Sequence, residues 1–403
     1  MRVPQLIAPD LNQKGIKRTE LGQLKPIEGS FTWSGRDFNS EDLYTYTLNE
    51  QDVEEVHHGL ANFLSLRLNN DEVSSENFPL PRLGRVLWQA AQWIHQGHGF
   101  VVFRGLDPAL HSVEENVIIY LGLSSHVADV RGLQDKKGNV LSHITSSKLW
   151  DVPMEKRHGI HSNQSLPFHT DMGCDILALQ VRQNATSGGC TSLSSAWTVF
   201  NHLVREEPDT AATLLTPNWP VQISGKKPRY YLAPVFEIHD GRLLVSMDPH
   251  RLGPPTNSTA DADDDDDDEQ DEDDIPALTD AQRRALDRVS EVAEQTELRL
   301  SLQTGDFLFF NNLALLHRRE AYKEDEKLPS RHLVRLWLRN SKLGWTIPPL
   351  MMDPWRAAFE KDAGVEMKYP LHPPDKYVVP KYTTGSAAFV MDDGEQSGAS
   401  LLS

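Results

Sequence analysis

The sequence predicts an α+β fold in which helices come first and a β-sheet core follows. Residues 48–66 and 80–95 carry apolar side chains at helical spacing. Gly97-His98-Gly99 interrupts this pattern, and the run Phe100-Val101-Val102-Phe103 that follows has the continuous apolar composition of a buried strand. The N-terminal helices are therefore expected to cover a sheet that begins near residue 100.

Further strands and helices are expected along the rest of the chain. Predicted strands span residues 175–182, 307–310 and 331–338, and predicted helices span residues 194–205 and 280–294. The second helix is expected to be capped by Thr279, with Leu286 and Val289 on its inner face. Residues 230–238 and 242–247 are predicted to form a hairpin about the turn Asp240-Gly241. We interpret this set as a distorted double-stranded β-helix, or jelly-roll, core with flanking helices, in which binding groups line the open mouth.

One domain accounts for the whole length. The 403 residues are 39% hydrophobic, enough for a large core, and no linker divides them. The expected parts are an N-terminal helical cover (about 1–97), the jelly-roll core (about 98–345), an acidic loop insertion (256–276) and a C-terminal extension (346–403).

The acidic insertion dominates the charge of the chain. Residues 261–274 hold 12 of its carboxylates, and without them the net charge of −18 becomes −6. A block of like charges repels itself, so we expect a disordered surface loop. It lacks the glycine and the oxygen spacing of an EF-hand calcium loop. The acidic balance also disfavours a nucleic-acid partner.

Cysteine content and hydropathy bear on the compartment. Cys174 and Cys190 are too few for a disulfide scaffold, so reduced thiols are expected. The N-terminus has no apolar run typical of a signal peptide, and no stretch of 18 apolar residues suggests a membrane span. A cytoplasmic protein with a small-molecule substrate is expected, and the oligomeric state stays open.

The strongest chemical signal is Phe168-His169-Thr170-Asp171 together with His317. Residues i and i+2 of a strand point the same way, so His169 and Asp171 can present a nitrogen and an oxygen to one ion. His317 would complete one face of the ion. Two histidines and one carboxylate that leave about three positions open are the arrangement of non-haem Fe(II) oxygenases.

Two arginines follow His317 on a predicted strand. Arg331 and Arg335 share one face of that strand, whereas His332, Val334 and the next alternate residues share the other. A guanidinium stays protonated and is costly to bury alone, so this face needs anionic partners. A dicarboxylate co-substrate would supply one.

With these motifs the chain resembles the Fe(II)/2-oxoglutarate-dependent oxygenases of the taurine dioxygenase and clavaminate synthase-like superfamily, in its fungal-type branch. The resemblance runs from about Phe31 to Trp337. It implies that His169, Asp171 and His317 are the catalytic iron ligands, and that Arg331, 14 residues after His317, binds the distal carboxylate of 2-oxoglutarate.

The resemblance extends to two further positions and to the reaction. Thr191, in Gly188-Gly189-Cys190-Thr191, matches a threonine that contacts the same carboxylate, and Arg335 matches a position that grips an anionic substrate group. Cys190 departs from the pattern, which has Asp there, but Thr191 is retained. The implied cofactors are Fe(II), 2-oxoglutarate and O₂, with succinate and CO₂ as co-products. Halogenating relatives lack the carboxylate that Asp171 supplies, so hydroxylation, desaturation or cyclisation of a small anionic metabolite is favoured.

Two other functional classes remain open. A hydrolase could use the same three ligands around Zn²⁺ to activate water, without need of Arg331. A jelly-roll binding protein that has lost catalysis is the other alternative. His143, His158 and His161 have no distinctive spacing, and we interpret them as loop histidines.

Overall fold

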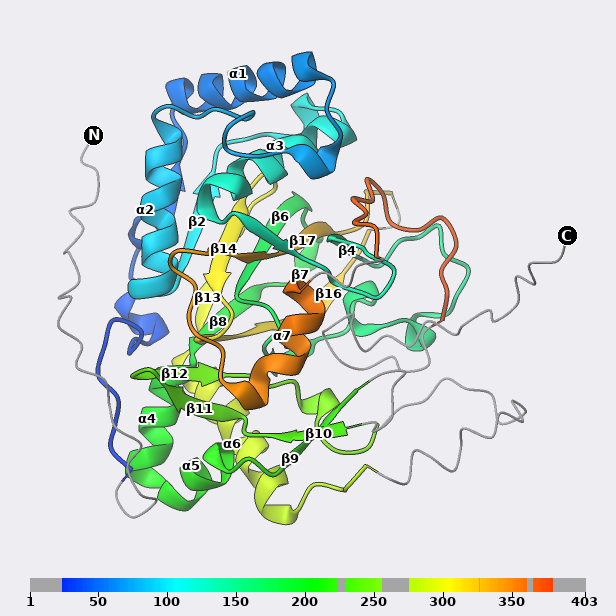
Figure 1. The fold of residues 1–403 in the computed structure, drawn as a ribbon. Coiled ribbons are helices and arrows are strands. Elements are labelled where there is room, and N and C mark those ends of the chain that lie inside the picture. The colour runs from blue at the N-terminus through cyan, green and yellow to red at the C-terminus, as the bar shows by residue number, and fades with distance from the viewer. Residues whose placement is uncertain (1–23, 224–229, 256–274, 326, 361–364, 380–403) are drawn as a thin grey trace, which may run out of the picture.

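The computed structural model describes residues 24–223, 230–255, 275–325, 327–360 and 365–379, and it confirms an α+β architecture (Figure 1). Two sheets make up the centre of the molecule. Three helices cover the larger sheet: α1 (Glu50–Leu66), α2 (Leu83–Gln96) and α3 (Val113–Val127). Another three pack on the smaller sheet or on one another: α4 (Ala196–Glu206), α5 (Pro208–Leu215) and α6 (Asp280–Thr296).

The larger sheet has seven strands and is buried on both faces. Its order is β1 (Thr45–Thr47), β2 (Phe100–Arg104), β14 (Phe307–Asn311), β6 (Ile176–Gln183), β17 (His332–Arg339) and β3 (Val130–Gly132), with β4 (Leu141–Thr145) also on β17. On β14, Leu308 and Phe310 face the space between the sheets, whereas Phe307 and Phe309 face the helices. Burial of both faces explains why these strands appear in the sequence as continuous apolar runs.

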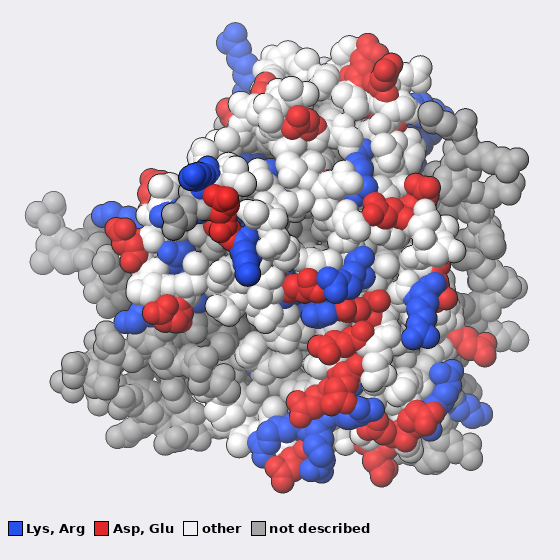
Figure 2. Space-filling model, turned by 180° about the vertical axis from the view of Figure 1, so that it is seen from behind, with Lys and Arg blue, Asp and Glu red and all other residues white. Residues whose placement is uncertain are grey.

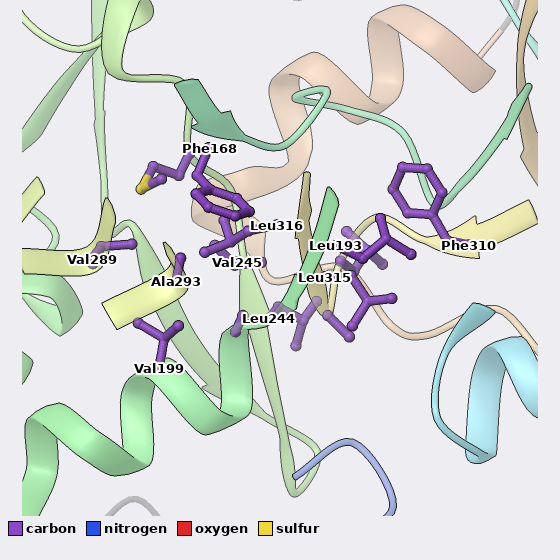
Figure 3. Packing of buried hydrophobic residues seen from close by; sticks show 14 of the residues in the cluster. Phe168, Leu193, Val199, Leu244, Val245, Val289, Ala293, Phe310, Leu315 and Leu316 are labelled. Atoms are coloured by element: carbon purple, nitrogen blue, oxygen red, sulfur yellow. The ribbon is translucent and has the colours of Figure 1, made fainter. Parts of the chain in front are cut away.

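The smaller sheet carries part of the functional site. Its order is β13 (Leu298–Leu300), β8 (Thr191–Ser195), β15 (Leu315–Arg319) and β5 (Leu166–His169). One face looks toward the larger sheet, and the other packs on helices. Figure 3 shows this packing, in which Phe168 and Leu316 lie near Val289 and Ala293 of α6. The alternation therefore turns His169, next to Phe168, toward the interior.

Three two-stranded ribbons complete the β-structure. They are β9 (Trp219–Gln222) with β10 (Tyr230–Ala233), β11 (Phe236–His239) with β12 (Arg242–Val245), and β7 (Ser187–Gly188) with β16 (Tyr322–Lys323). The predicted turn at Asp240-Gly241 is confirmed, since both residues have positive φ angles of 48° and 74°. The predicted first strand of that hairpin was too long. Residues 230–233 pair with β9 instead, because Pro234 precedes a separate strand.

Helix boundaries follow capping residues. Thr279 caps α6 as predicted, accepting a hydrogen bond from the Gln282 backbone nitrogen at 3.2 Å. The helix predicted from residue 194 begins at Ala196, because Ser195 is its cap and ends strand β8. The α3 helix was not predicted; it is apolar on nearly all sides because it lies buried between other elements. Short 3₁₀ turns span Gly35–Asp37, Glu41–Leu43, Asn70–Glu72, Pro108–Leu110, Met154–Lys156, Gly159–His161, Pro249–Arg251 and Pro349–Met351.

Three further sequence predictions concern the acidic insertion, the cysteines and membrane-spanning helices. Most of the acidic insertion 256–276 lies outside the described residues, and the chain resumes at Ile275, which is buried. Cys174 and Cys190 are free thiols, as expected. Among the helices in the described part of the chain, none combines the length and apolar character needed to cross a membrane.

The surface carries both signs of charge. On the face in Figure 2, acidic and basic side chains are interspersed. Pairs such as Arg288 with Glu207, at 2.6 Å, and Arg104 with Glu41, at 2.7 Å, are partly exposed. Exposed pairs of this kind contribute about 0–1 kcal/mol each, so stability depends mainly on the two cores on either side of the larger sheet.

The C-terminal part folds back over the loop that precedes the metal-binding motif. After α7 (Met352–Phe359), the Lys368 carbonyl accepts a hydrogen bond from Val140 at 2.9 Å, and the Pro374 carbonyl accepts one from Trp150 Nε1 at 2.7 Å. The hydroxyl of Tyr377 accepts a hydrogen bond from the backbone nitrogen of His158 at 2.7 Å. Residues far apart in sequence thus enclose this loop.

Four histidines lie under this cover; His143 and His158 are buried, and His161 and His332 are half-buried. His143 and His332 share a hydrogen bond of 2.8 Å between Nδ1 and Nε2, and His161 Nε2 bonds to the His143 carbonyl oxygen at 3.1 Å. Burial lowers the pKa of His143 to about 4 and those of His161 and His332 to about 3, and it lowers the pKa of His158 well below its usual value. All four are neutral in the folded protein near pH 7.

We expect the free energy of unfolding to fall as the pH drops below about 6.5, the ordinary histidine pKa. The unfolded chain takes up protons there that the folded protein does not, at a cost on the order of 2 kcal/mol per buried histidine between pH 7 and 5. Urea unfolding at several pH values measures this. His161→Asn should reduce the pH dependence, with His58→Asn at an exposed position of α1 as control. Equal pH dependence in wild type and His161→Asn would contradict this account.

Candidate metal and co-substrate site

Three predicted ligands come together between the two sheets. One potential ligand atom from each of His169, Asp171 and His317 lies within 4.8 Å of the others. His169 ends β5 and stands directly opposite His317 on β15, with ring centroids 4.1 Å apart. Oδ1 of Asp171 lies 3.8 Å from Nε2 of each histidine. The three groups therefore converge on one point, as the sequence predicted.

The local backbone differs from the prediction at Asp171. Strand β5 ends at His169, so Asp171 is not on a strand but in the turn that follows. Asn312 holds this turn: its Oδ1 accepts the Asp171 N–H at 2.9 Å, and its Nδ2 donates to the carbonyls of Asp171 at 2.7 Å and Cys174 at 2.8 Å. The side chain direction is thus fixed by a buried amide rather than by strand alternation.

The two oxygens of the Asp171 carboxylate have different surroundings. Oδ2 accepts a hydrogen bond from Trp337 Nε1 at 2.9 Å and pairs with Arg335 Nη1 at 2.8 Å. Oδ1 is buried and has no hydrogen-bond partner among the described residues. A buried carboxylate oxygen without a partner is costly. Its position beside two imidazole nitrogens is what a metal ligand requires.

The contacts of the two histidines suit metal binding. His169 Nδ1 donates to the Pro167 carbonyl oxygen at 2.7 Å, so Nε2, 3.8 Å from Oδ1 of Asp171, is the nitrogen that can serve as a ligand. Burial, with smaller effects from His169 and Arg335, lowers the pKa of His317 well below its ordinary value. An imidazole that resists protonation is available as a ligand at neutral pH.

Arg335 lies in the site, where it contacts other side chains of the protein. Besides the pair with Asp171, its Nε donates to Gln134 Oε1 at 2.8 Å. Gln134 is fully buried, and its amide nitrogen donates to the carbonyls of Val140 and Arg335 at 2.6 and 2.8 Å. Arg335 thus orients the Asp171 carboxylate; a contact with substrate stays a prediction.

Arg331 shares the inward face with Arg335, as predicted. The intervening Leu333 and the following Trp337 belong to the core between the sheets, whereas Val334 and Leu336 face the helices. Arg331 is 3% exposed; its Nη2 donates to the Gly189 carbonyl at 3.3 Å, and its Nη1 has no partner in the described part of the chain. Burial lowers its pKa, but a guanidinium remains charged. Its free donor suits an anionic ligand.

The Gly-Gly-Cys-Thr segment packs against Arg331. Gly188 and Gly189 have φ angles of 76° and 71°, and a Cβ on Gly189 would lie 3.1 Å from Arg331 Nε. Glycine is therefore required both for the backbone conformation and for the close approach. Thr191 follows on β8, where it is buried and stands opposite Arg319 of β15. The structure thus places Thr191 and Arg331 around the same short segment.

The residues present fit a divalent transition metal. Two neutral imidazoles and one carboxylate oxygen, all on one side, match the ligand set that non-haem Fe(II) uses. Sequence reasoning missed the supporting residues Asn312, just after β14, and Trp337 of β17, which contact Asp171, and Gln134, between β3 and β4, which holds Arg335. The one available signal was the polar pair Asn311-Asn312 at the end of an apolar strand.

Comparison with known proteins identifies a matching family and similar sequences. Residues 65–337 match the family described as "Taurine catabolism dioxygenase TauD, TfdA family". The chain is 32% identical over 354 residues to the taurine hydroxylase-like protein SAT17 of Stachybotrys chartarum, covering 83% of this chain and 86% of that protein. It is 25% identical over 323 residues to FR-33289 synthase of Streptomyces rubellomurinus, covering 78% and 90%.

Solved structures share the fold. An asparagine oxygenase in complex with Fe(II), 3-hydroxyasparagine and succinate matches with a TM-score of 0.56 at 17% identity, covering 73% of this chain and 93% of that one. The non-haem iron oxygenase OrfP, in complex with Fe and alpha-ketoglutaric acid, matches with a TM-score of 0.51 at 16% identity, covering 74% and 94%. These likenesses show that the chain shares the fold of these oxygenases.

The family predicted from the metal motif and the arginine spacing is therefore confirmed. The match spans more than half of the chain, and it includes the three residues that converge at the site as well as Arg331 and Arg335. This chain belongs to the TauD/TfdA family of dioxygenases.

Proposed function

We propose that this dioxygenase binds Fe(II) through His169, Asp171 and His317 and uses 2-oxoglutarate and O₂ to oxidise a small anionic metabolite. The oxidation would be a hydroxylation, desaturation or cyclisation, with succinate and CO₂ as co-products. The observation that carries the proposal is the carboxylate of Asp171. One oxygen is bound by protein donors, whereas the other has no hydrogen-bond partner among the described residues and lies beside two imidazole nitrogens.

Each residue near the metal would have a defined task. Bound Fe(II) would supply the redox chemistry that activates O₂. The buried guanidinium of Arg331 would bind the distal carboxylate of 2-oxoglutarate by a charge-assisted contact, with the Thr191 hydroxyl as a second donor. Arg335 and Trp337 would keep Oδ2 of Asp171 occupied, so that Oδ1 faces the metal. The ring of Phe310, 5.1 Å from that of His317, would shield the site from water.

The larger framework is proposed to be a jelly-roll. The four-stranded and seven-stranded sheets share one hydrophobic core, and the two histidines lie on the inner face of the smaller sheet. We further propose that the whole chain forms a single oxygenase domain, with the acidic insertion as a surface loop. A cytoplasmic location, where Fe(II) and 2-oxoglutarate are available, completes this proposal.

An amino acid or a secondary-metabolite intermediate is the proposed class of substrate. The asparagine oxygenase and OrfP were solved with hydroxyasparagine and hydroxyarginine, and the similar proteins from sequence comparison are a taurine hydroxylase-like protein and FR-33289 synthase. A substrate carboxylate could contact Arg335 in addition to Asp171, because a guanidinium has five donors.

We expect a visible charge-transfer absorption band when 2-oxoglutarate is added to the anaerobic protein loaded with Fe(II). Chelation of the iron by the 2-oxo acid produces the band, so His169→Ala should abolish it and Arg331→Ala should weaken it. Anaerobic titration followed by absorbance makes the measurement. A folded wild-type protein that binds metal without forming the band would favour the hydrolase or the binding protein, and turnover without O₂ would identify the hydrolase.

The contacts to Oδ2 of Asp171 predict an effect on metal affinity. Trp337→Phe removes the hydrogen bond and Arg335→Met removes the ion pair, and each should weaken Co(II) binding about 10- to 100-fold, as loss of partners that orient metal ligands usually does. Isothermal titration calorimetry measures the affinity.

Trp355→Phe is the matched control for these variants. Trp355 Nε1 donates to Oδ1 of Asp175 at 2.8 Å, the same type of contact on a carboxylate that is not a predicted ligand. This variant should bind Co(II) as tightly as wild type. Unchanged affinity in both Trp337→Phe and Arg335→Met would show that the contacts to Oδ2 do not orient the ligand.

A further inference from the structure

A second buried arginine lies beside Arg331. Arg319 is 5% exposed and Arg331 is 3% exposed. Their Cζ atoms lie 5.2 and 5.3 Å from the centre of the same ring, that of Tyr322. Among the described residues, neither guanidinium forms a salt bridge with a carboxylate. Two buried positive charges therefore share one region of the protein. The carboxylate of Glu324 accepts a hydrogen bond from the backbone nitrogen of Arg331 at 3.0 Å, but it forms no salt bridge with either guanidinium.

Strand register places Arg319 on the same side as the metal ligands. It follows His317 by two residues on β15, so both side chains leave the same face, and on β8 it stands opposite Thr191. Arg318, between them, points to the other face and pairs with Glu297 at 2.6 Å. Arg319 and Thr191 are thus cross-strand neighbours, and Arg331 contacts Gly189 of the same segment.

The guanidinium of Arg319 is held in place, but some of its N–H groups have no hydrogen-bond partner among the described residues. Its Nη2 donates to the carbonyls of Gly159 at 3.2 Å, Ser162 at 3.0 Å and Gln164. Its Nε and Nη1 are buried and lack hydrogen-bond partners in the described part of the chain, as does Nη1 of Arg331. Three backbone contacts fix the group while donors of both arginines remain available.

This arrangement is unfavourable unless an anion binds. Burial of an ionised group without a counter-charge is costly, and two like charges add mutual repulsion. The face of the Tyr322 ring attracts cations but contributes only about 0.5–2 kcal/mol per contact. A carboxylate has two oxygens that can accept hydrogen bonds from two guanidiniums at once. Such a ligand would remove both the unpaired donors and the repulsion.

We propose that Arg319 is a second residue that binds the distal carboxylate of the 2-oxo acid co-substrate, together with Arg331. The proposal rests on the proposed function and extends it to a residue that was not among the site residues predicted from the sequence. A 2-oxo acid that lacks the distal carboxylate would leave the buried guanidinium of Arg331 without an anion. With Arg319 in the same subsite it would leave two such cations unpaired, which would make the site more selective for a dicarboxylate.

The test compares two co-substrates that differ only in the distal group. The probes are 2-oxoglutarate and 2-oxopentanoate, a 2-oxo acid of the same chain length without the second carboxylate, each titrated into the anaerobic Fe(II) protein. Arg319→Met should weaken 2-oxoglutarate binding about 10- to 100-fold, the effect of losing a charged hydrogen bond. Its affinity for 2-oxopentanoate should equal or exceed that of wild type. Arg318→Met, on the opposite face of the same strand, should change neither affinity.

The outcomes separate the possible roles of Arg319. Equal loss of affinity for both acids would show that Arg319 acts by holding residues 159–164 in place, and it would overturn the proposal. Unchanged affinity for both acids would also overturn it. If Arg319→Met fails to fold or to bind Co(II), Arg319→Lys decides, because it keeps the charge but loses the fork of donors. Arg319→Lys should then lose affinity for 2-oxoglutarate only. Absence of the charge-transfer band in wild type would refute the proposed function instead.

Discussion

The structure of the site depends on the different surroundings of the two carboxylate oxygens of Asp171. Trp337 and Arg335 bind Oδ2, and Asn312 holds the turn from which the side chain projects. Oδ1 is left beside the Nε2 atoms of His169 and His317. An unpaired carboxylate oxygen is unfavourable inside a protein, so the surrounding fold must offset the cost of leaving Oδ1 in this position. A metal ion bound to Oδ1, as we propose, would relieve that cost.

The two sheets bring these groups together from distant parts of the chain. The smaller sheet supplies His169 and His317 from adjacent strands, and the larger sheet supplies Arg335 and Trp337 from β17. The apolar side chains shared by the sheets exclude water and strengthen the electrostatic interactions within the site. Residues 365–379 close over the loop before the metal motif, so this part of the site is enclosed by segments more than 200 residues apart.

Sequence reasoning found the groups that we propose to carry the chemistry, but not those that position them. His169, Asp171, His317 and Arg331 were recognisable because residue type and spacing together match a known ligand set. Asn312 and Gln134 were not, since their role depends on long-range contacts that spacing does not reveal. Arg319 was missed for a similar reason. It stands next to Arg318 in the sequence, where the two arginines look alike. In the folded strand their side chains alternate, so Arg319 is buried and Arg318 pairs with Glu297. The ends of the strands near 171 and 230 were set by turns and by alternative pairing partners.

The most direct test is a crystal structure of the protein grown anaerobically with Fe(II) and 2-oxoglutarate. We expect iron bound to Nε2 of His169, Nε2 of His317 and Oδ1 of Asp171, with Oδ2 still contacting Trp337 and Arg335. We also expect the distal carboxylate of 2-oxoglutarate between Arg331 and Arg319. Iron bound through Oδ2, or at any other place in the molecule, would contradict the proposed role of Asp171.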